Sequence, residues 1–104
     1  ALAMTAEPLS AEDAARWGLI WKVVEDEQLM AEAIALAERF ANGPTRAYAL
    51  TKQAIQAAAA NSLDQQLDVE RAKQREAGLS DDYKEGVAAF LEKRAADFRG
   101  KRKG

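Results

Sequence analysis

Apolar positions recur at helical spacing along the middle of the chain. Over residues 26–42 they repeat at i, i+4, i+7 and i+11, which predicts a helix with a buried stripe made of Leu29, Ala33, Leu36 and Phe40. A second stripe predicts a helix over residues 44–60 that packs through Ala47, Leu50, Thr51, Ala54, Ile55 and Ala58. Asn42-Gly43 ends the first helix, and Pro44 fits the first position of the second. Because the junction is so short, we expect these two helices to form a helical hairpin.

A further helix is predicted over residues 62–76, where Ser62 and Gln65 make a capping box. Its large apolar residues are few, and its second half has the almost wholly polar sequence ERAKQRE. A face of this kind is typical of a helix exposed to solvent. A polar arm that lies against another subunit is the alternative.

The last predicted helix begins after Ser80, a good N-cap, and its first turn carries Asp81 and Asp82 at the positive end of the helix dipole. One face gathers residues at helical spacing, namely Tyr83, Gly86, Val87, Phe90, Leu91 and Arg94. Gly86 is unexpected in this position, since glycine inside a helix costs about 1 kcal/mol relative to alanine. We therefore expect another group to approach the backbone of Gly86 closely.

The beginning of the chain is more interrupted. Residues 1–7 have the character of the end of a helix begun upstream, and Pro8 breaks it. Ser10 can cap a short helix over residues 11–17, which Gly18 closes.

The run LIWKVV, residues 19–24, is rich in β-branched and aromatic residues and predicts a short strand or an extended connector. Trp17 and Trp21 are the largest hydrophobic residues near it, and we expect them to anchor this corner to a core. A substrate-stacking role for either tryptophan is the alternative.

These elements predict an all-α protein of four to five helices, with a helical hairpin, C-terminal helices and at most one short strand. Residues 1–24 are interpreted as the end of an upstream domain with its connector, and residues 25–104 as a C-terminal helical region. The 104-residue chain is 48% hydrophobic, but almost half of that fraction is alanine, which favours helix without adding much core volume. Such a chain forms helices more easily than it buries them, so we expect it to dock on other protein.

Charge and residue types exclude several kinds of chemistry. The formal net charge of −2 gives no reason to expect a nucleic-acid partner, and no apolar run approaches the ~20 residues that span a membrane. Cysteine and histidine are absent, which removes thiolate metal sites and the commonest general base, and a cytoplasmic location is expected. Paired carboxylates such as Asp81 and Asp82 stand at helix starts, where capping accounts for them. We therefore predict no catalytic residue and no metal site within these residues.

Two groups of short motifs resemble one known family. Near the end, Ser80-Asp81-Asp82, Glu85-Gly86, the run AFLEKR over residues 89–94 and the run FRGK over residues 98–101 resemble the C-terminal end of the enoyl-CoA hydratase/isomerase (crotonase) superfamily. Near the start, the runs LSAEDA and WGL are similar to a segment that the superfamily places upstream of those motifs. Two positions depart from the family pattern, because Asp81 stands in place of glutamate and the proline before the final aromatic is absent.

The resemblance implies that the chain is a fragment of a longer enzyme and inactive alone. The family's oxyanion hole and acidic residues lie in an N-terminal spiral domain, where they stabilise the enolate of a thioester. Its C-terminal helical region assembles trimers or hexamers and helps to close the acyl-CoA pocket. On this chain the resemblance assigns Phe98 and Lys101 to the CoA nucleotide, the ring for adenine and the ammonium for phosphate. Coenzyme A is then part of the substrate, and no separate cofactor is implied.

Within the superfamily, the runs WGLIWKVV and ERAKQREAGLSDDYKEGVAAFLEKR resemble the ring-epoxide isomerases that act on 1,2-epoxyphenylacetyl-CoA in phenylacetate degradation. A generic enoyl-CoA hydratase is the nearest alternative. From another class, a stand-alone helical module that binds a protein partner is also open. A nucleic-acid-binding domain led by the basic tail RGKRKG is disfavoured, because that run is short and lacks interleaved aromatics.

Overall fold

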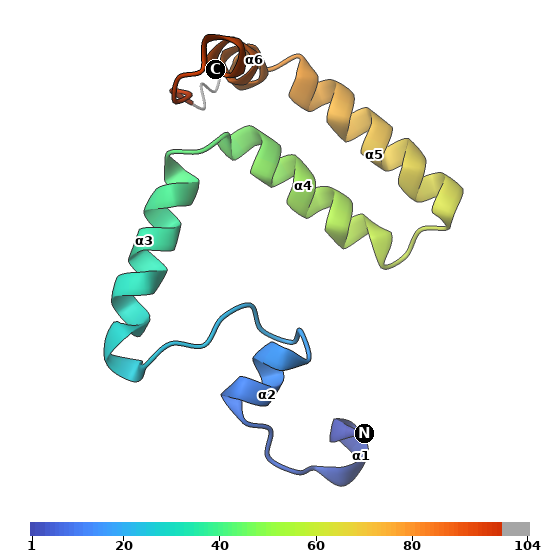
Figure 1. The fold of residues 1–104 in the computed structure, drawn as a ribbon. Helices are drawn as coiled ribbons and strands as arrows, with labels where there is room; N and C mark the ends of the chain where they lie inside the picture. The colour runs from blue at the N-terminus through green and yellow to red at the C-terminus, as the bar shows by residue number, and fades with distance from the viewer. Residues whose placement is uncertain (99–104) are drawn as a thin grey trace. The chain divides into compact units, whose positions relative to one another are not determined.

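A computed structural model describes residues 1–98 of the chain and divides it into two compact units, Ala1–Ile34 and a second that begins at Ala35 (Figure 1). Every regular element in the described part is helical, so the all-α prediction is confirmed. The expected division between residues 24 and 25 stays a prediction.

The first unit contains the short helices α1 (Leu2–Thr5) and α2 (Ala11–Arg16). Ser10 caps α2 as predicted, since its Oγ accepts a hydrogen bond from the Asp13 N–H at 3.1 Å. Gly18 follows with a φ of +80°, the left-handed conformation that glycine adopts most readily after a helix. Within residues 19–24 the chain is an irregular connector and not a strand.

The prediction that the two tryptophans anchor a core is wrong for the described chain. Trp17 is 55% exposed and Trp21 is 75% exposed, whereas Ala14 is the buried apolar residue of this unit. The described residues of this unit therefore bury neither indole ring.

The turn η1 (Asp26–Gln28) leads directly into α3 (Leu29–Ala41), so the helix predicted over residues 26–42 is present with a tighter first turn. Helix α4 (Thr45–Ala58) follows, with Pro44 as its N-cap residue and not, as predicted, its first helical residue. At the junction the Phe40 and Tyr48 rings meet edge to face, with 5.4 Å between their centroids.

The hairpin is formed by α4 and α5 (Leu63–Gly78), not by α3 and α4 as the sequence predicted. These two helices run side by side in Figure 1, and Leu50, which is only 3% exposed, is buried on α4. The short link between α3 and α4 makes them neighbours in sequence. Side-chain contacts decide which helix packs along α4, and that helix is α5.

Polar side chains of α5 supply several of those contacts. Gln66 donates through Nε2 to the Ala54 carbonyl at 3.1 Å, and Lys73 donates to Oε1 of Gln53 at 2.6 Å. Arg46 at the start of α4 also forms an ion pair with Glu76 near the end of α5. The polar half of α5 is therefore not simply exposed to solvent, because part of it binds α4 of the same chain.

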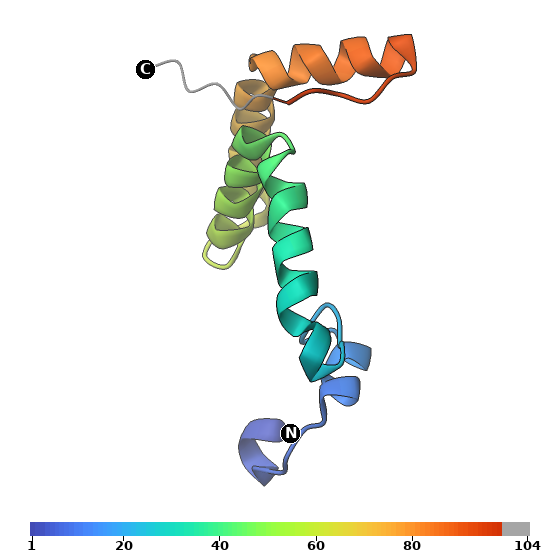
Figure 2. The ribbon, with the colours of Figure 1, turned by 90° about the vertical axis from the view of Figure 1, so that its left-hand side faces the viewer.

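Helix α6 (Asp81–Glu92) crosses the end of this hairpin, and the chain after it doubles back along the helix (Figure 2). The predicted caps of α5 and α6 are confirmed. Ser62 and Gln65 form the complete capping box, and the Ser80 Oγ accepts from the Tyr83 N–H at 3.1 Å.

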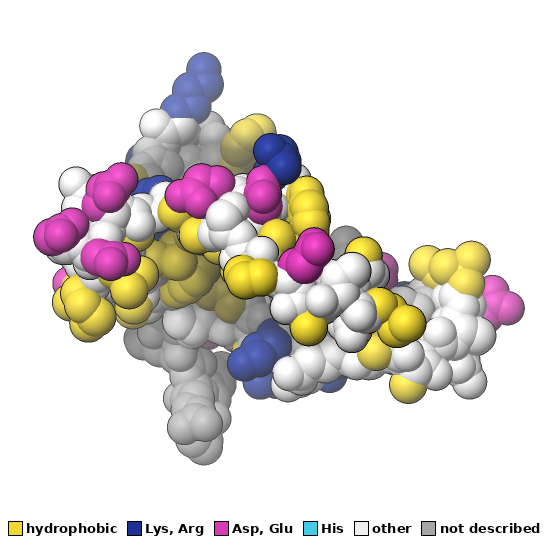
Figure 3. Space-filling model, turned by 90° about the horizontal axis from the view of Figure 1, so that it is seen from below, with side chains coloured by type: hydrophobic (Ala, Val, Ile, Leu, Met, Phe, Trp, Pro, Cys, Tyr) yellow, Lys and Arg dark blue, Asp and Glu magenta, His cyan; other side chains and the backbone are white. Residues whose placement is uncertain are grey.

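Little apolar side-chain surface is buried within the described residues. The buried apolar residues are Ala14, Leu50 and Ala89, two of which are alanines. Hydrophobic side chains instead lie open on the face drawn in Figure 3. The apolar stripe predicted for α3 is part of this pattern, since Leu29 is 56% exposed and Phe40 is 49% exposed.

Candidate functional site

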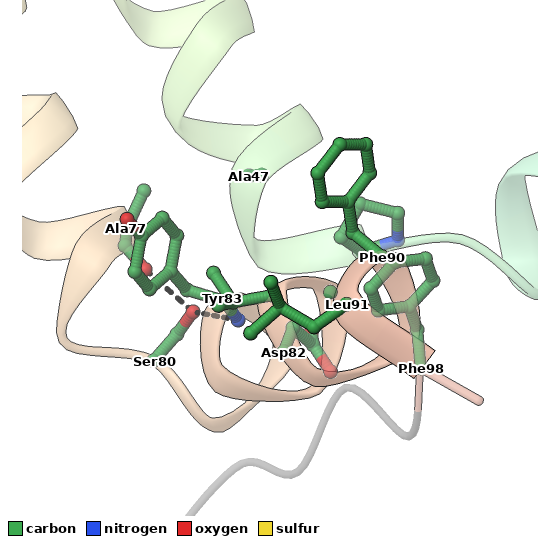
Figure 4. A pocket seen from close by; sticks show the side chains of 11 residues that line it. Ala47, Ala77, Ser80, Asp82, Tyr83, Phe90, Leu91 and Phe98 are labelled. Carbon is green, nitrogen blue, oxygen red and sulfur yellow. Dashed lines mark hydrogen bonds between the residues drawn. The ribbon is translucent and has the colours of Figure 1, made fainter. Parts of the chain in front are cut away.

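The main candidate site is an apolar pocket of about 350 Å³ beside α6, within the second unit. Its walls come from the apolar face of α6, the start of α4, the end of α5 and the segment after α6: Pro44, Ala47, Ala77, Ser80, Asp82, Tyr83, Gly86, Val87, Phe90, Leu91 and Phe98. Figure 4 shows Tyr83 beside Ala77 at one end of the pocket and Phe90 with Phe98 at the other. The face predicted for α6 is therefore confirmed as one surface except for Arg94, which lies beyond the end of the helix at Glu92. This surface lines an open pocket and not a closed core.

Phe98 lies against Gly86 in this pocket. A Cβ built on Gly86 would stand 3.6 Å from Cε1 and 3.8 Å from Cζ of the Phe98 ring. The expectation that a group approaches the Gly86 backbone is thus met by Phe98. The space is nevertheless sufficient for a methyl group at ordinary contact distance, so this ring does not itself require glycine.

The ring is brought there by a turn at the end of α6. Lys93 has a φ of +53°, and the N–H groups of Lys93 and Arg94 bond back to the carbonyls of Phe90 and Ala89 at 3.3 and 3.0 Å. A left-handed residue of this kind ends a helix and reverses the chain. Residues 95–98 can consequently return along the side of α6.

A carboxylate on α6 holds the returning segment. Glu85 accepts two hydrogen bonds from the Arg94 guanidinium, at 2.5 Å to Oε1 and 3.0 Å to Oε2, and a third from the Asp97 N–H at 2.8 Å. Arg94 also donates to Glu92 at 2.6 Å. A two-point contact between arginine and a carboxylate fixes orientation as well as distance. We call Glu85, Arg94 and the Asp97 N–H the tail clamp.

The electrostatics of the tail clamp favour the charged arginine. Hydrogen bonding to Glu85 first, and to Glu92 second, raises the pKa of Arg94 above its ordinary value. The Arg94 side chain is 41% exposed and that of Glu85 is 25% exposed, so solvent screens the attraction in part. The contribution of the clamp therefore lies mainly in its geometry.

Of the two residues assigned to CoA, the structure describes Phe98 and places its half-buried ring in the pocket wall. Lys101 lies outside the described residues, as does the rest of the basic tail. The assignment of Phe98 and Lys101 to the CoA nucleotide stays a prediction.

The tail clamp itself was missed by the sequence reasoning. Glu85 and Arg94 are nine positions apart, which is not a spacing at which side chains meet along one helix. The available signal was their joint presence in the family-like motifs Glu85-Gly86 and AFLEKR, without a physical reason to pair them.

Metal chemistry finds no support in the part of the chain that the structure describes, where no group of three or more Asp or Glu residues is placed to hold a metal ion. Asp82 is the buried charged residue of the pocket and has an interaction partner within the protein. Over residues 1–98, no helix has the length and apolar character needed to cross a membrane.

The chain belongs to the enoyl-CoA hydratase/isomerase family, which it matches over residues 1–101. It is 54% identical over 100 residues to 1,2-epoxyphenylacetyl-CoA isomerase of Escherichia coli K12, covering 96% of this chain and 38% of that protein. It is 42% identical to crotonyl-CoA hydratase of Syntrophomonas wolfei, covering 93% of this chain and 37% of that protein. In structure it matches an enoyl-CoA hydratase from Polaromonas sp. JS666 with a TM-score of 0.86 and 33% identity, covering 92% of this chain and 37% of the other.

These matches confirm the family inferred from the motifs, and the ring-epoxide isomerase is among the similar proteins. The chain spans somewhat more than a third of the length of these relatives.

Proposed function

We propose that this chain is the C-terminal helical part of an acyl-CoA-processing enzyme and that the complete enzyme isomerises a ring epoxide of phenylacetyl-CoA. The observation that carries the first statement is the apolar surface left open on the described chain, which includes Trp21 at 75%, Phe90 at 83% and Leu91 at 73% exposure. Phe90 and Leu91 belong to one apolar wall of the second unit, and exposed apolar surface of this kind marks a contact with other protein. The specific reaction is supported by the 54% identity to 1,2-epoxyphenylacetyl-CoA isomerase.

In this proposal the helices have two tasks. Their open faces join the subunits into a trimer or hexamer and cover part of the catalytic domain. Phe98 and Lys101 contribute to the CoA pocket, with the ring against adenine and the ammonium near phosphate. The acid/base groups and the oxyanion hole belong to the spiral domain, so the chain alone is inactive.

A second candidate is the hydration of a 2-enoyl-CoA, favoured by the 42% identity to crotonyl-CoA hydratase. Both reactions act on a CoA thioester. The enzymes would differ in the protein groups that surround the acyl part of the substrate. A helical module that acts alone by binding a protein partner would need no acyl-CoA at all.

The test joins this chain to its upstream coding sequence and assays the longer enzyme with 1,2-epoxyphenylacetyl-CoA and with crotonyl-CoA. Turnover of the epoxide with little hydration of crotonyl-CoA is expected. Hydration alone would establish the second candidate, and no activity with either thioester, in a protein of normal helix content, would contradict the proposal.

The CoA assignment has its own prediction in that longer enzyme. Phe98→Ala and Lys101→Ala should each raise the KM for acyl-CoA with little change in kcat, since they remove binding to a part of the substrate that does not react. Lys52→Ala, at an exposed position on α4, is the control. An unchanged KM in both variants would show that the assignment is wrong.

A further inference from the structure

We propose that Glu85 and Arg94 are positioning residues that fix where the Phe98 ring is presented to the nucleotide of the substrate. The proposal deepens the proposed function, on which its substrate part rests. Its structural part is the tail clamp, which joins a side chain on α6 to the segment that carries Phe98.

Two contacts, both made to the Glu85 carboxylate, hold that segment. The first is the ion pair between Glu85 and Arg94, made at both carboxylate oxygens. The second is the hydrogen bond from the Asp97 backbone N–H to Oε1 of Glu85 at 2.8 Å, one residue before Phe98. Because one carboxylate accepts both sets of bonds, the turn after α6 and the position of residue 97 are fixed together.

The hydrogen bond between Glu85 and Asp97 also positions the next residue, Phe98. Glu85 and Gly86 are consecutive on α6, and Asp97 and Phe98 are consecutive on the returning segment. Glu85 binds Asp97, and the Phe98 ring lies against Gly86. The hydrogen bond to Asp97 and the position of the ring beside Gly86 thus involve neighbouring residues on both segments. The hydrogen bond therefore sets the side of α6 on which the Phe98 ring lies.

The structural part can be measured without any substrate. An aromatic ring placed over a glycine displaces the resonances of its α protons, so nuclear magnetic resonance of the full chain labelled with ¹⁵N and ¹³C reports the distance between Phe98 and Gly86. Phe98→Ala defines the value without the ring. Glu85→Ala should move the Gly86 resonances to that value, and Glu85→Gln, which keeps one oxygen acceptor, should move them only part of the way.

Two further variants distinguish a loss of the tail clamp from a general loss of structure. Arg94→Gln removes the guanidinium but leaves Glu85 for Asp97, and it should give an intermediate displacement. Glu92→Gln removes the other carboxylate partner of Arg94 and should leave the Gly86 resonances unchanged. Helix content by circular dichroism is compared among all variants.

The substrate part is tested in the longer enzyme. Glu85→Ala should raise the KM for acyl-CoA by the same factor as Phe98→Ala, with kcat little changed, and Glu85→Gln should restore part of the affinity. Gly86 resonances unchanged by Glu85→Ala would overturn the clamp. Displaced resonances with an unchanged KM would support the clamp and overturn the role of Phe98 in the proposed function.

Discussion

At the scale of single residues, Gly43 and Gly86 have different surroundings although both stand beside an aromatic ring. A Cβ on Gly43 would lie 2.3 Å from the Tyr48 hydroxyl oxygen and 2.8 Å from Cζ, distances that force the ring to move. A Cβ on Gly86 would meet Phe98 at an ordinary 3.6 Å. A side chain at position 43 would thus displace the Tyr48 ring, whereas one at position 86 would fit beside Phe98.

Alanine substitutions at Gly43 and Gly86 should therefore change the stability of the chain in opposite directions. Gly86→Ala should stabilise α6, raising the free energy of unfolding by up to about 1 kcal/mol, since alanine is the better helix former. Gly43→Ala should lower it by about 1 kcal/mol, because the edge-to-face contact of Tyr48 with Phe40 is lost. Urea unfolding followed by circular dichroism measures both. A destabilising Gly86→Ala would indicate that a further group reaches the Gly86 backbone.

At the scale of elements, the helix starts depend on serine caps. The Ser80 Oγ accepts from the Tyr83 N–H at 3.1 Å and donates to the Ala77 carbonyl at 2.6 Å, which links the end of α5 to the start of α6. Ser62→Ala and Ser80→Ala should each cost about 1 kcal/mol of unfolding free energy. Thr45→Ala is the control, because α4 begins without a side-chain cap bond, and it should change stability by less than about 0.5 kcal/mol. Equal effects in all three variants would contradict the capping account.

The pairing of α4 with α5 depends on Leu50, the largest buried apolar side chain of the described chain. Leu50→Ala should lower the unfolding free energy by about 2 kcal/mol or more, as truncation of a buried leucine leaves a cavity. Thermal unfolding of this variant is compared with Lys52→Ala, an exposed position on the same helix, where little change is expected. A loss below about 0.5 kcal/mol at Leu50 would mean that α4 and α5 do not pack in solution.

The sequence predicted what depends on neighbours in the chain. Ser10, Ser62 and Ser80 were identified as caps, because a cap needs only the residues of the next turn. The partner of α4 was predicted incorrectly, since it follows from contacts such as Gln66 with Ala54 across twelve positions. The same limit explains why the motifs drew attention to Phe98 but not to the bonds from Glu85 that hold its segment.

At the scale of the whole molecule, the open apolar surface is the dominant property. Exposed large hydrophobic residues occur on every helix of the second unit and around the tryptophans of the first, while the buried core is small. Under the proposed function, the catalytic domain and neighbouring subunits cover such faces. We propose that other copies of the chain cover them when it is produced alone.

The solution mass of the 104-residue chain, measured by light scattering over a wide range of concentrations, tests this account most directly. Circular dichroism on the same samples confirms that the helices are present. The account predicts a defined oligomer, a trimer or hexamer, that dissociates on dilution as apolar faces become exposed to a hydrophobic dye. A well-folded monomer at every concentration, without dye binding, would contradict it and would favour the stand-alone module.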